Sequence, residues 1–441
     1  MKVLKFGGTS VGSASRMKEV IRLICDGEQK IVVLSAMSGT TNTLVEISDY
    51  LYKKNPDTAN EIINTLEQKY FLHIEELYKS EEYKQKAIDT VRPIFNHIRS
   101  FTKDLFTLFE EKAILAQGEL ISTAMVNLYL NEQGINSVLL PALEYMRTDK
   151  NGEPDVLYIK QRLTKLLEQH PNAEIYITQG YICLNAYGEI DNLQRCGSDY
   201  TASLVGAAIL AEEIQIWTDI DGMHNNDPRV VDKTAPVRHL HFEEAAELAY
   251  FGAKILHPTC ILPAKLNNIP VRLLNTMEPE APGTLISNTT EKNKIKAVAA
   301  KENITAIKIQ SGRMLLTYGF LRKVFEIFES YQTPIDMVTT SEVGVSLTID
   351  NKKHLSEIVA DLKKYGSVTV DEEMVIVCVV GDLAWENTGY ESQVVNAFKE
   401  IPVRMISYGG SNYNISFLVK SEDKKRALQS LSDHLFNSQE N

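Results

Sequence analysis

The stretch KFGGTS, residues 5–10, decides the fold class because of what stands on either side of it. Residues 1–6 form a short apolar run and residues 11–26 carry apolar side chains at helical spacing, which predicts a strand, a glycine turn and a helix. Adjacent glycines let backbone amides approach an anion, a helix N-terminus adds partial positive charge, and Lys5 adds a full charge. The turn matches neither the Walker pattern nor the dinucleotide-binding pattern. It indicates a phosphate site of another kind, although an ordinary strand-to-helix turn would look the same.

Length and composition place the chain among globular proteins. It has 441 residues, of which 44% are hydrophobic and 24% charged, enough for two or three domains. A net charge of −12 argues against nucleic acid or an anionic membrane as partner, because both attract basic surfaces. No apolar run reaches the roughly 18 residues of a membrane span, and no signal-peptide pattern is found. With five cysteines and no CxxC pair, we expect reduced thiols and a cytoplasmic protein.

A second strand and turn follow at residues 31–42, IVVLSAMSGTTN. The apolar half predicts a buried strand, and the remainder places Ser35, Ser38 and Thr41 at its carboxyl end, where open α/β sheets bind ligands. The same hydroxyl groups could instead cap a helix expected from about residue 44. The residues alone leave both interpretations open.

A long helical tract occupies residues 56–133, rich in Glu and Lys with interleaved apolar side chains. Most of its charges are expected on a solvated face. Within it, QGELIST at residues 117–123 sets Glu119 between a glycine and two apolar residues. Taken alone, this acid is more typical of a helix-capping carboxylate than of a ligand. Strands are expected next at residues 135–142 and 173–184.

The stretch LQRCGSDYTASLVGAAIL, residues 193–210, is a second candidate for chemistry. Its small residues predict a closely packed helix that begins at a Gly-Ser-Asp turn. A helix N-terminus with Arg195, Gly197 and Ser198 would form an anion nest, with Asp199 among positive partners. Asp199 could equally be a plain N-cap.

Residues 214–232, IQIWTDIDGMHNNDPRVVD, predict a strand followed by a loop that contains four acidic residues and Arg229. Such a loop at a strand end can hold a nucleotide and its Mg²⁺, because Mg²⁺ prefers oxygen ligands. Asn and Asp are also common where turns need unusual dihedral angles, so a plain turn-rich loop is the alternative.

The last elements of this domain are a helix and a strand. Residues 241–258 predict an amphipathic helix that ends at Pro258, with Lys254 near its C-terminal end. A strand is expected at residues 269–276. APGT, residues 281–284, then marks the exit from the domain.

Beyond residue 295 the expected elements become short and regularly ordered. One unit, between residues 305 and 370, reads strand, helix, two strands, helix and strand. A second unit, between residues 375 and 436, has the same order without the last strand. The spare apolar segment KAVAAK, residues 296–301, precedes the first unit. We infer that it completes the second sheet, so that the first unit is inserted into the second.

Seven motifs occur in one order along the chain: KFGGTSV, VVLSAMSGTTN, QGELIST, GSDYTA, WTDIDG with DPR, FGAKILHP and TTSEV. Together they resemble those of the monofunctional aspartate kinases, most closely the lysine-sensitive bacterial type. The resemblance implies an α/β fold, with an αβα amino-acid-kinase domain at residues 1–285 and two ferredoxin-like (βαββαβ) ACT domains after it. The first ACT domain, residues 304–372, would be inserted in the second, residues 296–303 plus 373–438. It also implies a homodimer formed through the ACT domains, or a tetramer.

The resemblance assigns roles to the matching residues of this chain. Lys5 and Asp199 would be catalytic. Aspartate would be bound by Ser35, Thr41, Glu119, Arg195 and Ser198. ATP would be bound by Lys5, Gly7, Gly8, Thr9, Thr218, Asp219, His224, Arg229 and Lys254. An amino-acid effector would contact Met314, Thr317, Phe320, Leu321, Ile335, Asp336, Thr340, Ser341 and Glu342. No residue is assigned as a metal ligand.

Two departures from the family pattern bear on these assignments. Cys196 stands where the family usually has glycine, and its Cβ narrows the backbone conformations available to the anion nest. His224 stands where the family often has tyrosine, so its contact with the nucleotide is left open.

The implied reaction needs no general base, because the side chain of aspartate has a reference pKa of about 3.9 and is already ionised. Catalysis would consist of positioning and of charge stabilisation around the γ-phosphate of ATP by Lys5 and Mg²⁺. Arg195 would hold the α-carboxylate of the substrate and Glu119 its ammonium group. The product would be 4-phospho-L-aspartate, the first intermediate of lysine, threonine and methionine biosynthesis.

Two other functions stay open at this point. One is a kinase of the same fold for another amino acid or for carbamate, against which the two ACT units argue. The other is a catalytically weak amino-acid sensor, against which the presence of Lys5, Arg195 and Asp199 argues. The expected effector is L-lysine, because Asp336 and Glu342 offer two acids to a cationic amino acid and a neutral effector would leave one of them unpaired.

Overall fold

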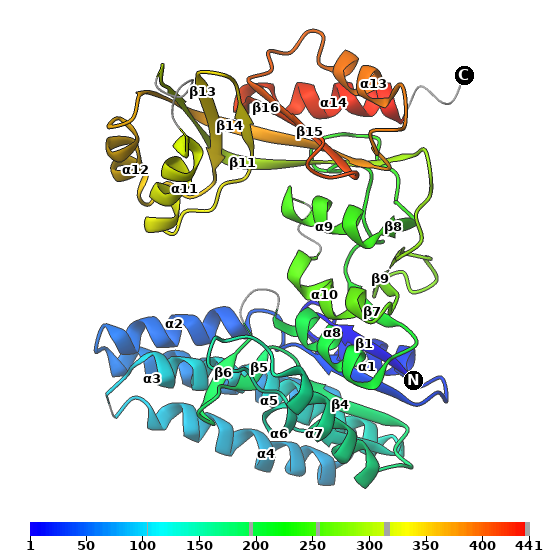
Figure 1. Ribbon diagram of the computed structural model, residues 1–441. Helices are drawn as coiled ribbons and strands as arrows, with labels where there is room; N and C mark the ends of the chain where they lie inside the picture. Colours follow the sequence, from blue (N-terminus) through cyan, green and yellow to red (C-terminus); the bar gives the residue numbers. More distant parts are fainter. Residues whose placement is uncertain (104, 194–196, 253–255, 313–317, 437–441) are drawn as a thin grey trace. The chain divides into compact units, whose positions relative to one another are not determined.

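The computed structural model describes residues 1–103, 105–193, 197–252, 256–312 and 318–436. The chain forms two compact units, and segments distant in sequence contribute to each (Figure 1). The first unit comprises Met1–Met223 and Leu256–Asn288, and the second comprises His224–Ile255 and Thr289–Asn441.

A mostly parallel sheet runs through the first unit. The strands that belong to this unit lie in the order β3, β4, β2, β1, β7, β9 and β10. They are β1 (Lys2–Phe6), β2 (Lys30–Leu34), β3 (Ser137–Leu140), β4 (Ile175–Gln179), β7 (Ile214–Thr218), β9 (Val271–Asn275) and β10 (Thr284–Ser287). Only β10 runs antiparallel to its neighbour, β9, among the strand pairs of this unit that the structure describes. The carboxyl ends of the parallel strands therefore meet at one edge, where such sheets bind ligands.

Helices cover both faces of this sheet (Figure 1). They are α1 (Ala14–Ile24), α2 (Thr40–Tyr52), α3 (Pro56–Leu77), α4 (Glu81–Ser100), α5 (Leu108–Glu132), α6 (Ala142–Tyr145), α7 (Val156–Gln169), α8 (Gly197–Ile209) and α10 (Pro258–Leu266). Leu4 and Phe6 of β1 pack in one core with α1 to α5. Because side chains alternate along a strand, Lys5 points to the opposite face, on which α8 packs.

The tract expected to be helical over residues 56–133 is three separate helices. Asn55 caps α3, and Thr107 with Glu110 forms a capping box at the start of α5. By length and composition alone, α5 could cross a membrane, but 78% of its most apolar window is buried inside the structure. It is therefore packed as a core helix.

Two expectations about residues 241–284 are wrong. The helix expected to end at Pro258 is α9 (Phe242–Tyr250), and Pro258 instead opens α10, where its missing N–H costs nothing. Gly252, with a φ of +117°, lies just beyond α9 in a conformation that few other residues adopt. The exit expected at residues 281–284 leads directly into β10, a strand too short to be recognised by periodicity.

The strand expected at residues 173–184 is broken in two. β4 ends at Gln179, and β5 (Ile182–Leu184) turns away to pair with β6 (Ile190–Asn192) in a separate hairpin. Tyr181, between β4 and β5, has a left-handed φ of 69°. At that break the chain leaves the main sheet and enters the hairpin.

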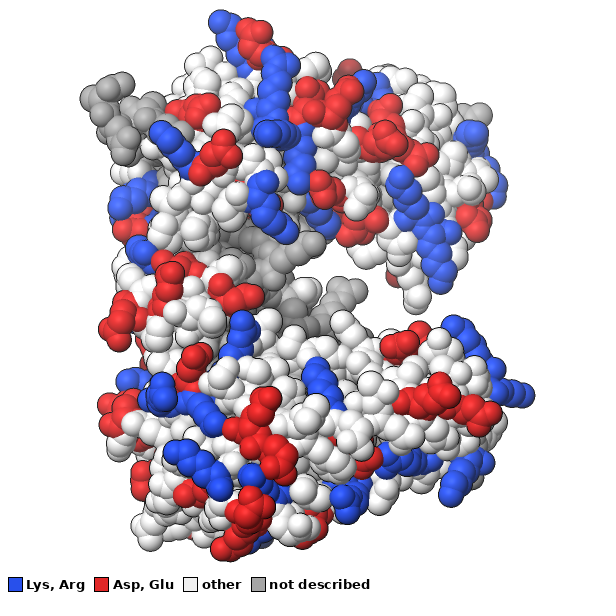
Figure 2. Space-filling model, turned by 180° about the vertical axis from the view of Figure 1, so that it is seen from behind, with Lys and Arg blue, Asp and Glu red and all other residues white. Residues whose placement is uncertain are grey.

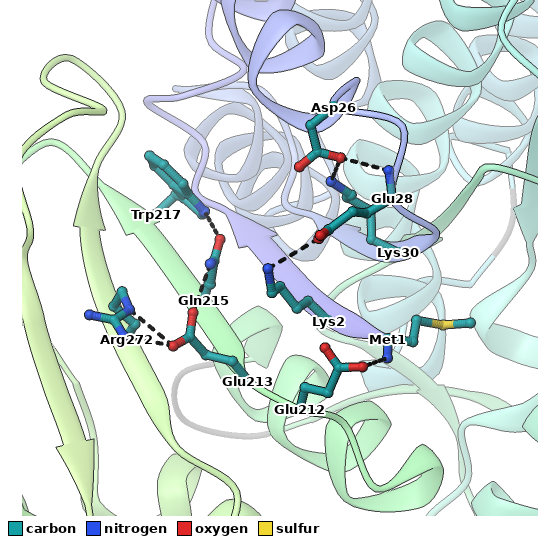
Figure 3. Close-up of polar contacts among 10 residues, drawn as sticks. All are labelled: Met1, Lys2, Asp26, Glu28, Lys30, Glu212, Glu213, Gln215, Trp217 and Arg272. Carbon is teal, nitrogen blue, oxygen red and sulfur yellow. Dashed lines mark hydrogen bonds and ion pairs between the residues drawn. The ribbon is translucent and has the colours of Figure 1, made fainter.

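Polar contacts gather at the amino ends of the central strands (Figure 3). The amino group of Met1 lies 2.6 Å from Glu212. Glu213, at the start of β7, lies 2.9 Å from the guanidinium group of Arg272 in β9. These ion pairs hold the edge of the sheet opposite the one at which the strands end.

The second unit contains a sheet in the order β12, β13, β11, β14, β16 and β15. The helices and strands of this unit are β8 (His239–His241), which is not part of that sheet, α9, β11 (Ile295–Gln310), α11 (Phe320–Ser330), β12 (Val338–Thr340), β13 (Gly344–Ile349), α12 (Leu355–Leu362), β14 (Ser367–Gly381), α13 (Tyr390–Ala397), β15 (Met405–Tyr408), β16 (Asn414–Lys420), η2 (Ser421–Asp423) and α14 (Lys424–Leu435). Each half of the sheet has a core of its own.

Strand pairing agrees with the inferred insertion. The first half of β11 pairs with the second half of β14, and the second half of β11 pairs with β13 and the first half of β14. The structure differs in that β11 and β14 are continuous, whereas two separate strands were expected in each. Asn303 and Glu373 have φ values of 60° and 55°, and the pairing register shifts next to Asn303, which divides the sequence pattern into two.

Candidate active site

A cavity of about 500 Å³ lies where β1 and β2 end and α8 begins. It is lined by Lys5, Gly8, Thr9, Ser35, Ala36, Met37, Ser38, Gly39, Thr41, Asn42, Glu119, Tyr181, Gly197, Ser198 and Asp199. Four stretches that the sequence analysis selected therefore contribute to one cavity: residues 5–10, 31–42, 117–123 and 193–210. Most of the lining comes from loops at strand ends, as expected for a ligand site in this class of sheet.

Lys5 and Asp199 form an ion pair at this cavity. The distance between Lys5 Nζ and Asp199 Oδ1 is 2.7 Å, and their side chains are 11% and 15% exposed. Asp199 lies in the first turn of α8 rather than before it, so its interpretation as an N-cap is wrong. The pair places one fixed positive and one fixed negative group at the cavity.

We call residues 35–42, between β2 and the first turn of α2, the substrate loop. Ser35 donates a hydrogen bond of 2.8 Å to Ser198, and the Ser35 carbonyl accepts one of 2.8 Å from Ser122. Gly39 caps α2 in a left-handed conformation, with no hydrogen bond from a side chain. The interpretation of the loop hydroxyls as caps of α2 is therefore wrong. Helix α2 begins at Thr40, four residues earlier than expected, so Thr41 lies in its first turn and lines the cavity from there.

Glu119 is held inside α5, not at its end, so the capping interpretation of this acid is wrong. One oxygen accepts a 3.1 Å hydrogen bond from the backbone N–H of Ala36. Burial raises the pKa of Glu119 to about 7. Its other oxygen, Oε2, has no partner within the described part of the chain. A cationic group of a ligand in the cavity would supply that partner.

The glycine turn after β1 packs closely on the substrate loop. A Cβ added to Gly8 would lie 2.8 Å from the carbonyl oxygen of Ala36, and the Gly8 carbonyl accepts a hydrogen bond from Ser38. Gly7 does not line the cavity, and its N–H lies 3.4 Å from the carbonyl oxygen of Trp217. Of the two glycines expected at phosphate, Gly8 alone is thus in position among the lining residues.

Thr218, Asp219, His224 and Arg229, also expected to bind ATP, are not among the residues that line this cavity. Thr218 accepts a hydrogen bond from the N–H of Ile220 at 3.2 Å, and Asp219 is exposed beyond β7. His224 and Arg229 belong to the second unit. There, His224 Nδ1 lies 3.0 Å from Thr234 Oγ1, and Arg229 pairs with Asp227 at 2.8 Å.

Some expected residues lie outside the described part of the chain. They are Arg195, Lys254, Met314 and Thr317, together with the unusual Cys196. Their predicted roles stay predictions.

The expected effector residues lie in the second unit. Phe320 is buried in the core under α11, whereas Leu321 is 38% exposed. Ile335 precedes β12, Thr340 ends it, and Ser341 and Glu342 are exposed in the turn before β13.

Asp336, the acid expected to share a cationic effector with Glu342, already has a cation beside it. Lys301 Nζ lies 2.6 Å from its Oδ1, and Tyr250 donates to the same oxygen at 2.6 Å. Glu342 is therefore the more accessible of the two acids.

The side chains that the structure describes at the candidate site do not form a complete metal site by themselves. The described residues contain no group of three His, Cys, Asp or Glu side chains that could hold a metal ion. Mg²⁺ bound with a nucleotide needs only one or two carboxylates, since phosphates and water supply the other ligands, and Asp199 offers one at the cavity. On the face shown in Figure 2, acidic and basic side chains are interspersed.

Sequence reasoning missed Tyr181, which lines the cavity in its left-handed conformation. A Cβ on Gly197 would lie 2.3 Å from its ring, so that glycine makes room for the tyrosine. A glycine inside an expected strand, here Gly180, was the available signal of a break.

Comparison with known proteins shows the family to which the chain belongs. The amino acid kinase family matches residues 1–275, and the ACT domain matches residues 377–435. The chain is 33% identical to lysine-sensitive aspartokinase 3 of Escherichia coli (strain K12) over 450 residues, which cover 98% of this chain and 99% of that protein. The chain belongs to the aspartokinase family. It is also 34% identical to the chloroplastic aspartokinase 1 of Arabidopsis thaliana over 462 residues, or 99% of this chain and 80% of that protein.

Solved aspartokinase structures have the same fold. E. coli aspartokinase III in complex with aspartate and ADP, described as the R-state, superimposes with a TM-score of 0.84 at 32% identity, covering 99% of this chain and 100% of that one. The complex of that enzyme with lysine and aspartate, described as the T-state, gives 0.81 at 33% identity, covering 99% of both chains. The prediction of an aspartate kinase with an amino-acid-kinase domain followed by an ACT region is confirmed.

Proposed function

We propose that this aspartokinase transfers the γ-phosphoryl group of ATP to the side-chain carboxylate of L-aspartate in the cavity between β1, β2 and α8. The observation that carries the proposal is the Lys5–Asp199 ion pair, 2.7 Å long, in one cavity with the unpaired oxygen of Glu119. The product is 4-phospho-L-aspartate, at the start of the synthesis of lysine, threonine and methionine. The two enzyme complexes with aspartate and with ADP or lysine support this choice of substrates.

In the proposed step, a side-chain oxygen of aspartate forms a bond to the γ-phosphorus while the bond to the bridging oxygen breaks and ADP leaves. No proton has to be removed from the nucleophile, because a carboxylate of reference pKa about 3.9 is ionised at neutral pH. The obstacle is the approach of two anions, which positive groups must offset. Lys5 supplies one such charge, and Asp199 fixes its position. Mg²⁺ bound with the nucleotide would supply further positive charge, with Asp199 as the carboxylate available to it.

The substrate is proposed to be held at both of its other charged groups. Glu119 would accept the ammonium group with the oxygen that lacks a partner, and Arg195 would hold the α-carboxylate. Ser35, Thr41 and Ser198 would complete the binding with their hydroxyl groups. This arrangement orients the side-chain carboxylate toward Lys5.

ATP is proposed to contact residues on both sides of the glycine turn. Besides Lys5, the set comprises Gly7, Gly8, Thr9, Thr218, Asp219, His224, Arg229 and Lys254. The hydrogen bond of Gly7 to Trp217 argues that Gly8 and Thr9 contribute more amide contact than Gly7 does. The kinase domain is proposed to span residues 1–285.

The second unit is proposed to regulate the enzyme. Its ACT domains would span residues 304–372 and residues 296–303 plus 373–438, and would bind L-lysine at the residues named above. The lysine complex of the E. coli enzyme supports lysine as effector. We further propose that the protein is cytoplasmic and forms homodimers through its ACT domains.

A coupled assay of ADP formation tests the substrate. With ATP and Mg²⁺, L-aspartate should support turnover, whereas L-glutamate and carbamate should support little, and added lysine should inhibit. Turnover with glutamate or carbamate above that with aspartate would assign the site to another substrate.

A further inference from the structure

A buried hydrogen bond ties the helical layer to the substrate loop. Tyr70 of α3 and Thr40 of α2 are both 0% exposed, and the distance between Tyr70 OH and Thr40 Oγ1 is 2.8 Å. Neither residue lines the cavity. Thr40, however, is the immediate neighbour of Thr41, which does.

The loop needs such support because its own helix end provides little. α2 begins after Gly39, which caps it without a hydrogen bond from a side chain. The N–H of Thr40 donates 3.0 Å to the carbonyl oxygen of Met37, so backbone contacts within the loop hold the start of the helix, and side chains that reach it come from other helices. The hydrogen bond between Thr40 and Tyr70 is one such side-chain contact, and it fixes Thr40, the first residue of α2.

Helix α5 binds the backbone of the loop. Glu119 accepts from the N–H of Ala36 at 3.1 Å, and Ser122 donates to the carbonyl oxygen of Ser35 at 2.8 Å. A Cβ added to Gly118 would lie 3.3 Å from Thr40 Cγ2, so α5 also lies close to the methyl group of Thr40.

Helix α3 also contacts the loop and its helix. The Tyr70 hydroxyl is its buried contact, and Lys69 adds a contact of 3.4 Å to the carbonyl oxygen of Ser38. Thr40 thus sits between a glycine of α5 at its methyl group and a hydroxyl of α3 at its oxygen. Removing the Tyr70 hydroxyl would leave a buried oxygen unpaired, and the loop would relax to satisfy it.

We propose that Tyr70 is a positioning residue for aspartate, acting through Thr40 to fix Thr41 and the amino end of α2 at the cavity. The proposal rests on the proposed function of the cavity. It predicts a larger effect on the binding of aspartate than on that of ATP, because Thr40 is the direct neighbour of Thr41, which is proposed to bind aspartate.

The test is the kinetics of Tyr70→Phe, which removes the hydroxyl and keeps the ring. KM for aspartate should rise roughly tenfold, a scale expected for small misplacements of binding groups, while kcat and KM for ATP change less than about twofold. Tyr78→Phe is the matched control, since the Tyr78 hydroxyl is also buried and donates 2.7 Å to the carbonyl of Met125, away from the loop. It should leave KM for aspartate unchanged.

Thr40→Val removes the same hydrogen bond from its other end and serves if Tyr70→Phe does not fold. It should raise KM for aspartate by a similar factor. The double variant should be little worse than either single variant, because both substitutions remove the same hydrogen bond. An unchanged KM for aspartate in the folded variants overturns the proposal, and so does an equal rise in Tyr78→Phe. If wild-type protein does not phosphorylate aspartate at all, the function proposed for the cavity fails instead, and this outcome is distinct from both.

Discussion

Lys5 Nζ lies 2.7 Å from Asp199 Oδ1, so the ammonium group at the end of β1 is held by the first turn of α8. This ion pair joins β1 and α8, two elements that are far apart in sequence. In the role proposed for Lys5, a lysine fixed in this way would already be oriented when a phosphate arrives, which would lower the reorganisation that the reaction requires.

Lys5→Ala should lower kcat by about 10²–10³, the usual cost of removing a preorganised electrostatic group, while the protein stays folded. Lys2→Ala is a suitable control on the same strand, since Lys2 pairs with Glu28 at the opposite end from the cavity. Steady-state kinetics and circular dichroism of both variants check the prediction. Retention of more than about a tenth of wild-type kcat in Lys5→Ala would contradict the catalytic role proposed for this lysine.

Glu119 should make stability depend on pH. Its pKa is raised by burial from 4.5 to about 7, so the folded state binds a proton more tightly than the unfolded state. The stability contributed by this group is therefore fully present below about pH 4.5 and is lost as the pH rises toward 7. Wild-type protein should lose stability relative to Glu119→Gln between pH 5 and 7, measured by urea unfolding without substrate.

Glu61→Gln, at an exposed position of α3, is the control for that measurement and should track wild type at each pH. A constant difference between wild type and Glu119→Gln across this range would contradict the buried, protonated state of Glu119. Aspartate should reverse the trend, because its ammonium group favours the ionised carboxylate.

Gly8→Ala should weaken ATP binding and lower stability. The added Cβ would lie 2.8 Å from the carbonyl oxygen of Ala36, which is backbone and cannot move aside cheaply. We expect KM for ATP to rise at least about tenfold and the melting temperature to fall by several degrees. Gly410→Ala, where an added Cβ meets nothing within 4 Å, should change neither quantity. A Gly8→Ala enzyme with wild-type KM for ATP would show that the close approach is not needed.

Glu342→Ala should weaken inhibition by lysine without lowering kcat. Asp336 is already paired with Lys301 at 2.6 Å, which leaves exposed Glu342 as the acid free to meet the effector's charge. A coupling of roughly 1–3 kcal/mol is usual, so the lysine concentration for half inhibition should rise several-fold or more. Glu329→Ala, an exposed acid at the end of α11, is the control. Inhibition of wild type by threonine but not by millimolar lysine would overturn the choice of effector.

Much of the fold could be predicted because its signals are local. The strand, turn and helix around Gly7 and Gly8, the buried strand before Ser35 and the small-residue helix after Ser198 are each visible within a few residues. Short elements without periodicity were not visible, as β10 and α10 show. Pro258 fits the end of one helix and the start of another equally well by residue type, and only the conformation of the chain after Tyr250 decides between them.

The site was predicted less completely, since its geometry depends on contacts between distant segments. Glu119 looked like a cap because its neighbours in sequence are a glycine and apolar residues, whereas its hydrogen bond goes to Ala36. Tyr70 gave no signal at all, being one of many aromatic residues in a helical tract, and its partner Thr40 lies in another helix. No pattern along the chain encodes such pairs.

The measurement that tests the central claim most directly is the identity of the phosphorylated product. Wild-type protein is incubated with ATP, Mg²⁺ and L-aspartate in the presence of hydroxylamine, which converts an acyl phosphate to a stable hydroxamate. Aspartyl hydroxamate and ADP should form in equal amounts, and omission of aspartate should abolish both. ADP formation without the hydroxamate, or no ADP formation with aspartate while another amino acid supports it, would contradict the assignment of this cavity as an aspartate kinase site.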